Sequence, residues 1–366
     1  MIDSLTIQDF RGIHALSIPA LNRINLIVGD NNCGKTSVLE AILLLRNPSD
    51  LSNLYRVAKL RDAAVFSSGI TLYENFTYMF PQKEDHLSIN VSAKCDGIPV
   101  ECSVSGEKKQ ILLDASEMRR YFASRYNKSS ISHNDEMETE AFSGTIFYTQ
   151  ENDFGEIPVE LNAYSKASGT PVSRKKAINI SYVSPFDHLR GNIVNRIIKE
   201  GSYKEICIAA LQLFDPDITD ILLLKSSEGN RPIEYLKHSQ LGLMPISTYG
   251  DGIKKVLVLA NAIANSAGGV LLIDEVETAI HKKYYDDIFN FLVKASRAFN
   301  VQMFITTHSI EAIDGLLSTQ NYEVQTETDE ISVVTIKKAE QKSYSRVLSG
   351  RSVAEDREAF GFEVRL

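Results

Sequence analysis

A glycine-rich segment near the N-terminus has the residue types and spacing needed to hold a chain of phosphates. Residues 29–36 read Gly-Asp-Asn-Asn-Cys-Gly-Lys-Thr, which fits the pattern Gly-x-x-x-x-Gly-Lys-Ser/Thr. In this pattern backbone N–H groups cradle phosphate oxygens, Lys35 reaches the terminal phosphates and Thr36 offers a hydroxyl to Mg²⁺. A chance match in a structural loop is disfavoured, because a predicted strand precedes the segment and a predicted helix follows it.

Two acidic residues end a short apolar run in the second half of the chain. Residues 269–275 read Gly-Val-Leu-Leu-Ile-Asp-Glu, which predicts Asp274 at the carboxyl end of a buried strand, where ligands bind in open α/β sheets. Solvated acids after a strand would explain this segment alone. With the phosphate loop upstream, we predict that Asp274 holds Mg²⁺ and that Glu275 orients or deprotonates the attacking water.

A third apolar run ends in a histidine between hydroxyl residues. Residues 304–309 read Phe-Ile-Thr-Thr-His-Ser. A lone histidine at a strand end is usually structural or solvated. The order of the three motifs instead favours an imidazole that contacts the terminal phosphate or the attacking water, so His308 is a candidate switch residue.

A glycine-containing loop is predicted at residues 247–255, which read Ser-Thr-Tyr-Gly-Asp-Gly-Ile-Lys-Lys and precede an apolar helix. The N-terminus of a helix presents free N–H groups, so this loop could hold a phosphate. A plain turn that caps a helix explains the spacing equally well.

An α/β core must position these motifs. Residues 24–28 are predicted to form the strand before the phosphate loop, and residues 37–45 form an almost wholly apolar helix that needs burial against a sheet. Between the motifs, residues 86–93 and 98–104 alternate apolar and polar side chains around a turn at Asp96-Gly97, which predicts antiparallel strands. Further helices are predicted at 203–214 and 252–265.

Nucleotide motifs at both ends of the chain favour one core that is split by a β-rich insertion over two domains in series. The predicted fold class is therefore α/β, a P-loop NTPase with an ABC-type ATPase head and a β-rich insertion lobe. The predicted division is residues 1–50 for the first part of the core, 51–180 for the insertion lobe, 181–335 for the second part of the core and 336–366 for a C-terminal tail.

Together these motifs resemble those of the ABC-type ATPases of the SMC, RecF and OLD (overcoming lysogenization defect) group, and most of all the stand-alone OLD-like AAA ATPases. The shared set is Phe10-Arg11-Gly12, the phosphate loop, a Ser/Thr-x-Gly-Asp-Gly signature at 248–252, Asp-Glu-x-Glu at 274–277 and Thr-His-Ser at 307–309.

The resemblance implies a head-to-tail homodimer that sandwiches two ATP molecules and hydrolyses them with Mg²⁺. Thr248 and Gly250 of one subunit would complete the site formed by Lys35 and Glu275 of the other, and assembly beyond a dimer is left open. The expected catalytic residues are Lys35, Glu275 and His308, and the expected metal ligands are Thr36 and Asp274. The expected nucleotide-binding residues are Arg11, Asn31, Asn32, Cys33, Gly34, Lys35, Thr36, Ser37, Thr248 and Gly250.

Other positions are assigned by the same resemblance. Asp251 matches the acid of the signature, and Glu277 and His281 resemble a segment that lines the dimer interface, although a surface helix start is an equal alternative. No Q-loop glutamine is evident, and Gln150 is the nearest candidate. The coiled coil of SMC proteins is not expected, nor is a TOPRIM nuclease domain after His308.

The composition favours certain classes of partner and a certain cellular compartment. The formal net charge of −8 disfavours nucleic-acid binding through the overall field. No apolar run approaches the length of a membrane span, and the N-terminus lacks the features of a signal peptide, so we expect a cytoplasmic protein. The four scattered cysteines suggest reduced thiols rather than a zinc site or a disulfide framework.

Two function hypotheses follow. The first is an ATP-gated dimer that regulates a separately encoded effector, such as a nuclease, in bacterial or phage-related defence. The alternative is a RecF/SMC-like ATPase that clamps DNA, supported by the basic clusters at 174–176 and 254–255, which are more often solvated surface. A transporter subunit is disfavoured by the long β-rich insertion.

Overall fold

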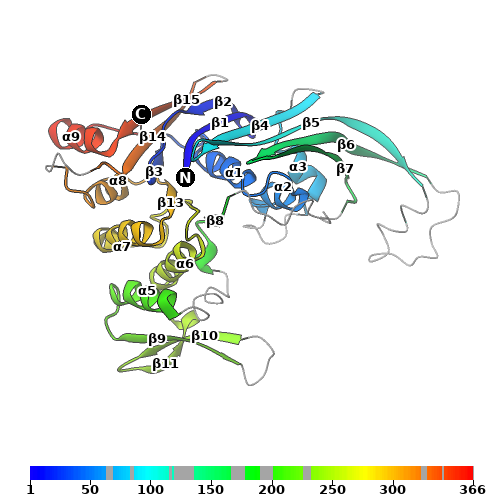
Figure 1. Ribbon diagram of the computed structural model, residues 1–366. Coiled ribbons are helices and arrows are strands. Elements are labelled where there is room, and N and C mark those ends of the chain that lie inside the picture. Colours follow the sequence, from blue (N-terminus) through cyan, green and yellow to red (C-terminus); the bar gives the residue numbers. More distant parts are fainter. Residues whose placement is uncertain are drawn as a thin grey trace.

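The computed structural model describes residues 1–62, 69–82, 86–114, 118, 136–165, 178–189, 201–225, 232–322, 328–339 and 342–365. Three sheets organise these residues (Figure 1). Figure 1 shows a long antiparallel sheet along one side of the molecule and a small sheet at the far end, beyond helices α5 and α6.

The core sheet has the strand order β15-β14-β3-β13-β12-β8. Its strands from β14 to β8 pair in parallel, whereas β15 pairs antiparallel with β14. Strands β3, β12 and β13 are buried along their whole length, as expected for parallel strands covered on both faces. The bounds are β3 Ile24–Val28, β8 Ile180–Val183, β12 Val270–Ile273, β13 Gln302–Thr306, β14 Ile331–Ala339 and β15 Lys342–Ser349.

Helices cover both faces of the core sheet. Ile27, Leu272 and Phe304 belong to the hydrophobic cluster of α1, while Leu26 and Ile305 belong to the cluster of α6, α7 and α8. The bounds are α1 Lys35–Leu44, α6 Asp251–Asn265, α7 Tyr285–Phe299 and α8 Ile310–Leu317. Alternate side chains of each strand therefore enter two separate cores, one on each face.

The second sheet is antiparallel throughout, in the order β2-β1-β4-β5-β6-β7. The predicted hairpin turn is confirmed: Asp96 and Gly97 have φ values of 49° and 78°, as a two-residue turn requires. The N-terminal strands β1 and β2 share this sheet with the strands of the insertion. The bounds are β1 Ile2–Phe10, β2 Ile13–Ile18, β4 His86–Cys95, β5 Ile98–Leu113, β6 Met137–Gln150 and β7 Asp153–Asn162. Helix α2 (Leu51–Ala58) packs beside α1, and α3 (Leu72–Thr77) packs beside α2.

The third sheet, β11-β10-β9, packs beside α5. Helix α5 confirms the helix predicted from residue 203. The bounds are α5 Gly201–Gln212, β9 Ile218–Lys225, β10 Pro232–His238 and β11 Gly242–Pro245. Across the part of the chain that the structure describes, no helix is both long enough and apolar enough to cross a bilayer.

The C-terminal residues are not a tail. Residues 336–339 end β14, the partner of β3, and β15 and α9 (Gly350–Phe360) follow. The sequence pattern missed this because only one residue of β15 is buried and the strand lacks a clear apolar alternation. The predicted division of the chain at residues 50 and 180 stays a prediction.

Candidate functional site

The predicted phosphate loop joins β3 to α1. Gly29 and Gly34 have φ values of 143° and 107°, which residues with a Cβ atom rarely adopt. A Cβ on Gly29 would also lie 2.2 Å from the carbonyl oxygen of Ile336, so the loop needs glycine to pack against β14. Helix α1 then begins at Lys35, and its N-terminal N–H groups face the loop.

Lys35 folds back over its own loop. Its Nζ donates hydrogen bonds of 2.8 Å to the carbonyl oxygens of Gly29 and Asp30, and its side chain is buried. Burial lowers the pKa of Lys35, and Cys33 and Asp30 oppose that shift. Cys33 is itself buried, with Sγ 3.9 Å from Nζ. The ammonium group thus lies where a loop-bound phosphate would meet it.

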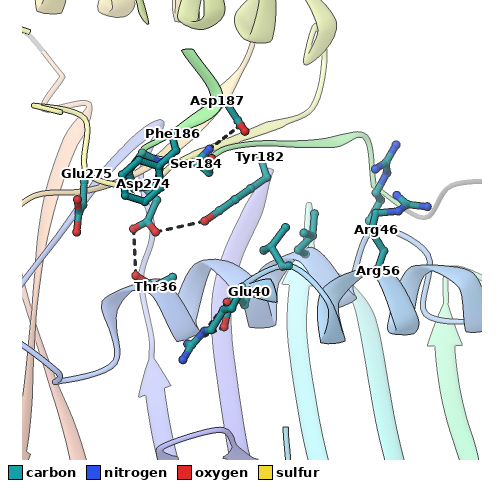
Figure 2. Close-up of a pocket in the computed structure, with 14 residues that line it drawn as sticks. Thr36, Glu40, Arg46, Arg56, Tyr182, Ser184, Phe186, Asp187, Asp274 and Glu275 are labelled. Carbon is teal, nitrogen blue, oxygen red and sulfur yellow. Dashed lines mark hydrogen bonds and ion pairs between the residues drawn. The ribbon is translucent and has the colours of Figure 1, made fainter. Parts of the chain in front are cut away.

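Asp274 is the centre of a buried hydrogen-bond network at the end of β12 (Figure 2). Its Oδ1 accepts from Thr36 Oγ1 at 3.2 Å and from Thr306 Oγ1 at 2.6 Å, and its Oδ2 accepts from the Tyr182 hydroxyl at 3.2 Å. A hydroxyl and a carboxylate are the hard oxygen ligands that Mg²⁺ prefers. The pair Thr36 and Asp274 therefore fits the predicted metal ion.

Glu275 and His308 face each other across the same edge of the sheet. Glu275 has a φ of 46°, and its N–H donates to Thr306 Oγ1 at 2.8 Å. Its Oε1 lies 3.9 Å from His308 Nε2, while the His308 N–H donates to Glu277 Oε1 at 2.7 Å. Glu275 and His308 thus follow two neighbouring strands, β12 and β13.

Glu275, His308 and residues of the phosphate loop border one open hollow of about 660 Å³. This volume lies within the range of small-molecule sites. Its lining residues are Asn31, Asn32, Gly34, Lys35, Thr36, Ser37, Arg61, Glu275 and His308. A second pocket of about 460 Å³ shares Thr36, Arg61 and Glu275 with it and extends along α1 (Figure 2).

Five predicted residues, Arg11, Cys33, Thr248, Gly250 and Asp274, are not among those that line the hollow. Asp274 lines the second pocket instead, and Cys33 is buried within the phosphate loop. Thr248 and Gly250 are exposed at the N-terminal end of α6. Arg11 instead forms a buried ion pair with Glu40 on α1, with Nε 2.6 Å from Oε2. Burial lowers the pKa of Arg11 to about 10, against the opposing effect of Glu40.

The remaining sequence assignments, Gln150, Asp251, Glu277 and His281, do not line either pocket. Gln150 ends β6. Instead, strand β8, the neighbour of β12, places the Tyr182 hydroxyl against Asp274. His281 caps the short 3-10 helix η6 (Lys282–Tyr284), where its Nδ1 accepts from the N–H of Lys283. Sequence reasoning missed Tyr182, Thr306 and Arg61. Only Thr306 carried a signal, as a hydroxyl residue in the histidine motif.

Arg61 joins the hollow to the buried Glu40. Its guanidinium group donates to both oxygens of Glu40 at 2.8 Å and to Ser37 Oγ at 2.9 Å. Glu40 is fully buried, and its Oε2 also lies 2.6 Å from the Nε of Arg11. One carboxylate therefore compensates two arginines behind the phosphate loop.

Replacing Glu40 by alanine should lower the free energy of unfolding by about 3–5 kcal/mol, because Arg11 would keep a buried charge without its partner. Urea unfolding followed by circular dichroism measures this loss. Glu330 provides the matched control, since it also pairs with two arginines, Arg23 at 3.5 Å and Arg297 at 2.7 Å, but is partly exposed. Glu330→Ala should lose about 1 kcal/mol or less, and equal losses in the two variants would contradict the prediction.

The comparison with known families identifies the chain. A family model described as "AAA domain, putative AbiEii toxin, Type IV TA system" matches residues 122–314, more than half of the chain. The chain belongs to this AAA-domain family. A second model, described as an AAA ATPase domain, matches residues 1–143 and so includes the phosphate loop.

Individual proteins are also similar to this chain. A Helicobacter pylori protein named ATP/GTP phosphatase is 21% identical over 348 residues, which cover 89% of this chain and 91% of that protein. The DNA replication and repair protein RecF of Francisella tularensis subsp. mediasiatica is 36% identical over 93 residues, which cover 25% of this chain and 24% of RecF.

Solved structures that are similar to this chain include an SMC head bound to the C-winged-helix domain of ScpA. Its TM-score is 0.49 and its sequence identity 13%, and the match covers 96% of this chain and 99% of that one. The SMC head domain from Thermotoga maritima has a TM-score of 0.47, 12% identity and coverage of 95% and 98%. The predicted class, an α/β P-loop NTPase, is confirmed by the family match and by the parallel core sheet with the loop between β3 and α1.

Proposed function

We propose that this chain binds ATP with Mg²⁺ and hydrolyses it to ADP and phosphate. The observation that carries the proposal is that Lys35, Thr36, Glu275 and His308, which come from three separate motifs, border one hollow. The Helicobacter pylori relative named ATP/GTP phosphatase supports nucleotide hydrolysis as the reaction class.

The proposed roles follow from the geometry of the site. Lys35 binds the terminal phosphates, and Thr36 and Asp274 hold Mg²⁺, which when bound neutralises charge on the phosphate oxygens. Glu275 orients or deprotonates the attacking water, and His308, which lies 3.9 Å away, contacts the terminal phosphate or that water.

We also propose that the active form is a head-to-tail homodimer. Thr248 and Gly250 are exposed and are absent from the lining of their own hollow, as expected of residues that complete a partner's site. The N-terminal N–H groups of α6 behind them suit a phosphate.

The biological role that we propose is regulation of a separately encoded effector, such as a nuclease, by an OLD-like ATPase in bacterial or phage defence. The family description names a putative toxin of a type IV toxin–antitoxin system, which is a system with a separate second component. The motifs shared with OLD-like ATPases support the same role.

Phosphate release by the purified full chain tests the enzymatic proposal. We expect ATP-dependent release with Mg²⁺, loss of release when EDTA removes the metal, and a shift from monomer to dimer with ATP in sedimentation velocity. Absence of turnover with Mg²⁺ would overturn the proposal.

Capture of tagged Glu275→Gln protein from its native host with ATP and Mg²⁺ tests the biological role. Mass spectrometry that recovers a nuclease-like or toxin-like protein supports effector regulation. Recovery of DNA without a protein partner would move the proposal to the alternative function.

That alternative is a DNA clamp, favoured by the RecF match over 93 residues. Its predicted basic clusters add little support. Residues 174–176 lie outside the described residues, and of the second cluster Lys255 is fully buried while Lys254 pairs with Asp251 at 3.0 Å. Steep loss of DNA binding with salt would favour the clamp, and absent or salt-insensitive binding would oppose it.

A further inference from the structure

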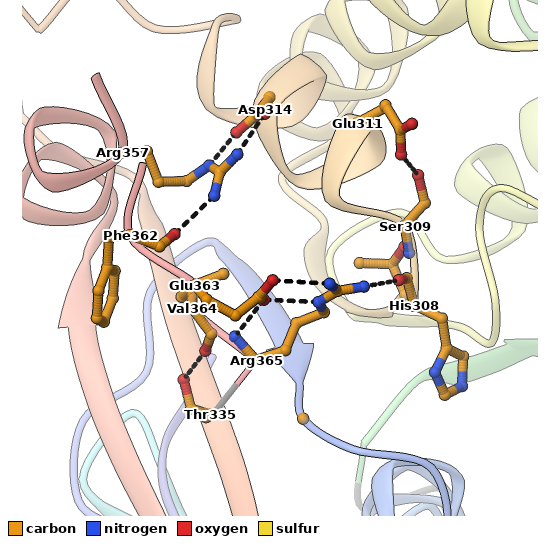
Figure 3. Close-up of polar contacts among 12 residues, drawn as sticks. His308, Ser309, Glu311, Asp314, Thr335, Arg357, Phe362, Glu363, Val364 and Arg365 are labelled. Atoms are coloured by element: carbon orange, nitrogen blue, oxygen red, sulfur yellow. Dashed lines mark hydrogen bonds and ion pairs between the residues drawn. The ribbon is translucent and has the colours of Figure 1, made fainter. Parts of the chain in front are cut away.

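Residues 362–365, the last that the structure describes, form a strap. This strap lies against the loop of residues 307–309, which contains His308 (Figure 3). The strap follows Gly361, whose φ of 63° ends helix α9. Val364 is fully buried, and its carbonyl oxygen accepts from Thr335 Oγ1 at 2.8 Å. The carbonyl oxygen of Phe362 accepts from Arg357 at 2.6 Å. The strap is therefore fixed to β14 and to α9.

Arg365 extends from this strap to His308. Its Nη1 donates to the carbonyl oxygen of His308 at 2.8 Å, while Nε and Nη2 donate to the two oxygens of Glu363 at 2.7 Å. The planar guanidinium group makes all three bonds at once, which a lysine cannot do. The hydrogen bonds from Arg365 lower the pKa of Glu363 to about 2, so this pair stays ionised at neutral pH.

The His308 peptide groups are consequently held from two sides. The N–H of His308 donates to Glu277, next to the β12 acids, and its carbonyl oxygen accepts from Arg365. Helix α8 starts only at Ile310, with Ser309 as its cap, so neither group is fixed by a helix. These two hydrogen bonds hold the peptide groups on both sides of the His308 side chain.

We infer that Arg365 is a positioning residue that holds His308 in the hollow and couples the C-terminal strap to the switch histidine. This inference rests on the proposed ATPase function, because it assigns a support to one of the proposed catalytic residues. The strap contributes no atom to the lining of the hollow, so its effect passes through the His308 backbone.

Steady-state kinetics of the full chain tests the inference. Arg365→Ala should lower kcat about tenfold with KM changed less than about twofold, because Arg365 is not among the residues that line the hollow. Arg365→Lys should recover part of the loss. The matched control is Arg297→Ala, which removes an arginine–glutamate pair of the same 2.7 Å length on α7 and should leave kcat unchanged.

A double-mutant cycle separates positioning from general destabilisation. In a His308→Ala background, Arg365→Ala should lower kcat by no more than about twofold further, since its target is already gone. An equal tenfold loss in both backgrounds, or an unchanged kcat for Arg365→Ala, would overturn the inference.

Hydrogen exchange gives a readout that does not depend on turnover. Amides of residues 308–310 should exchange at least about tenfold faster in Arg365→Ala than in the parent or in Arg297→Ala. Absence of ATP hydrolysis by the parent chain would refute the proposed function. Unchanged hydrogen exchange at residues 308–310 in Arg365→Ala would refute the role of the strap.

Discussion

Lys35→Ala should abolish measurable ATP binding, with an affinity loss of at least about 100-fold. The ammonium group is the cation at the start of α1 that borders the hollow, and hydrogen bonds to charged groups each contribute about 1.5–3 kcal/mol. Equilibrium titration with a fluorescent ATP analogue and Mg²⁺ measures the loss.

The control for this variant must separate binding from folding, because Lys35 also donates to the carbonyl oxygens of Gly29 and Asp30. Lys338→Ala is matched, since Lys338 Nζ donates to the Gly12 carbonyl at 3.1 Å but lies on exposed surface. Both variants should keep the circular dichroism spectrum of the parent, and only Lys35→Ala should lose ATP. Retained affinity in Lys35→Ala would refute the assignment of the loop.

Short contiguous motifs made the core of the site predictable from sequence. Each motif spans only a few consecutive residues: the phosphate loop, the acids after β12 and the histidine after β13. All three motifs follow parallel strands of one sheet. Since the carboxyl ends of parallel strands share one edge, their spatial convergence followed from the order of elements.

Long-range pairing was not predictable in the same way. Strand β1 pairs with β4 through contacts such as Ile7 with Val91, and no local pattern specifies a partner so distant in the chain. The same reason applies to Tyr182, whose contact with Asp274 depends on β8 lying beside β12. The sequence pattern also did not predict the ion pair between Arg11 and the buried Glu40.

Glu275→Gln should retain ATP binding but lower turnover at least about 100-fold, because glutamine keeps the shape of the side chain and cannot take a proton from water. Retained binding is expected since Lys35, Thr36 and Asp274 are untouched. With hydrolysis slowed, ATP should hold the dimer together, which sedimentation velocity would detect as a persistent dimer. Single-turnover phosphate release gives the rate.

The comparison variant for this substitution is Glu355→Gln, the same change at an exposed position of α9. It should hydrolyse ATP at the parent rate and dissociate as ATP is consumed. Hydrolysis by Glu275→Gln at the parent rate would show that another group activates the water. The role of Glu275 would then be limited to its two side-chain contacts. Its Oε2 accepts a hydrogen bond from Thr278 at 3.3 Å, and its Oε1 lies 3.9 Å from His308 Nε2.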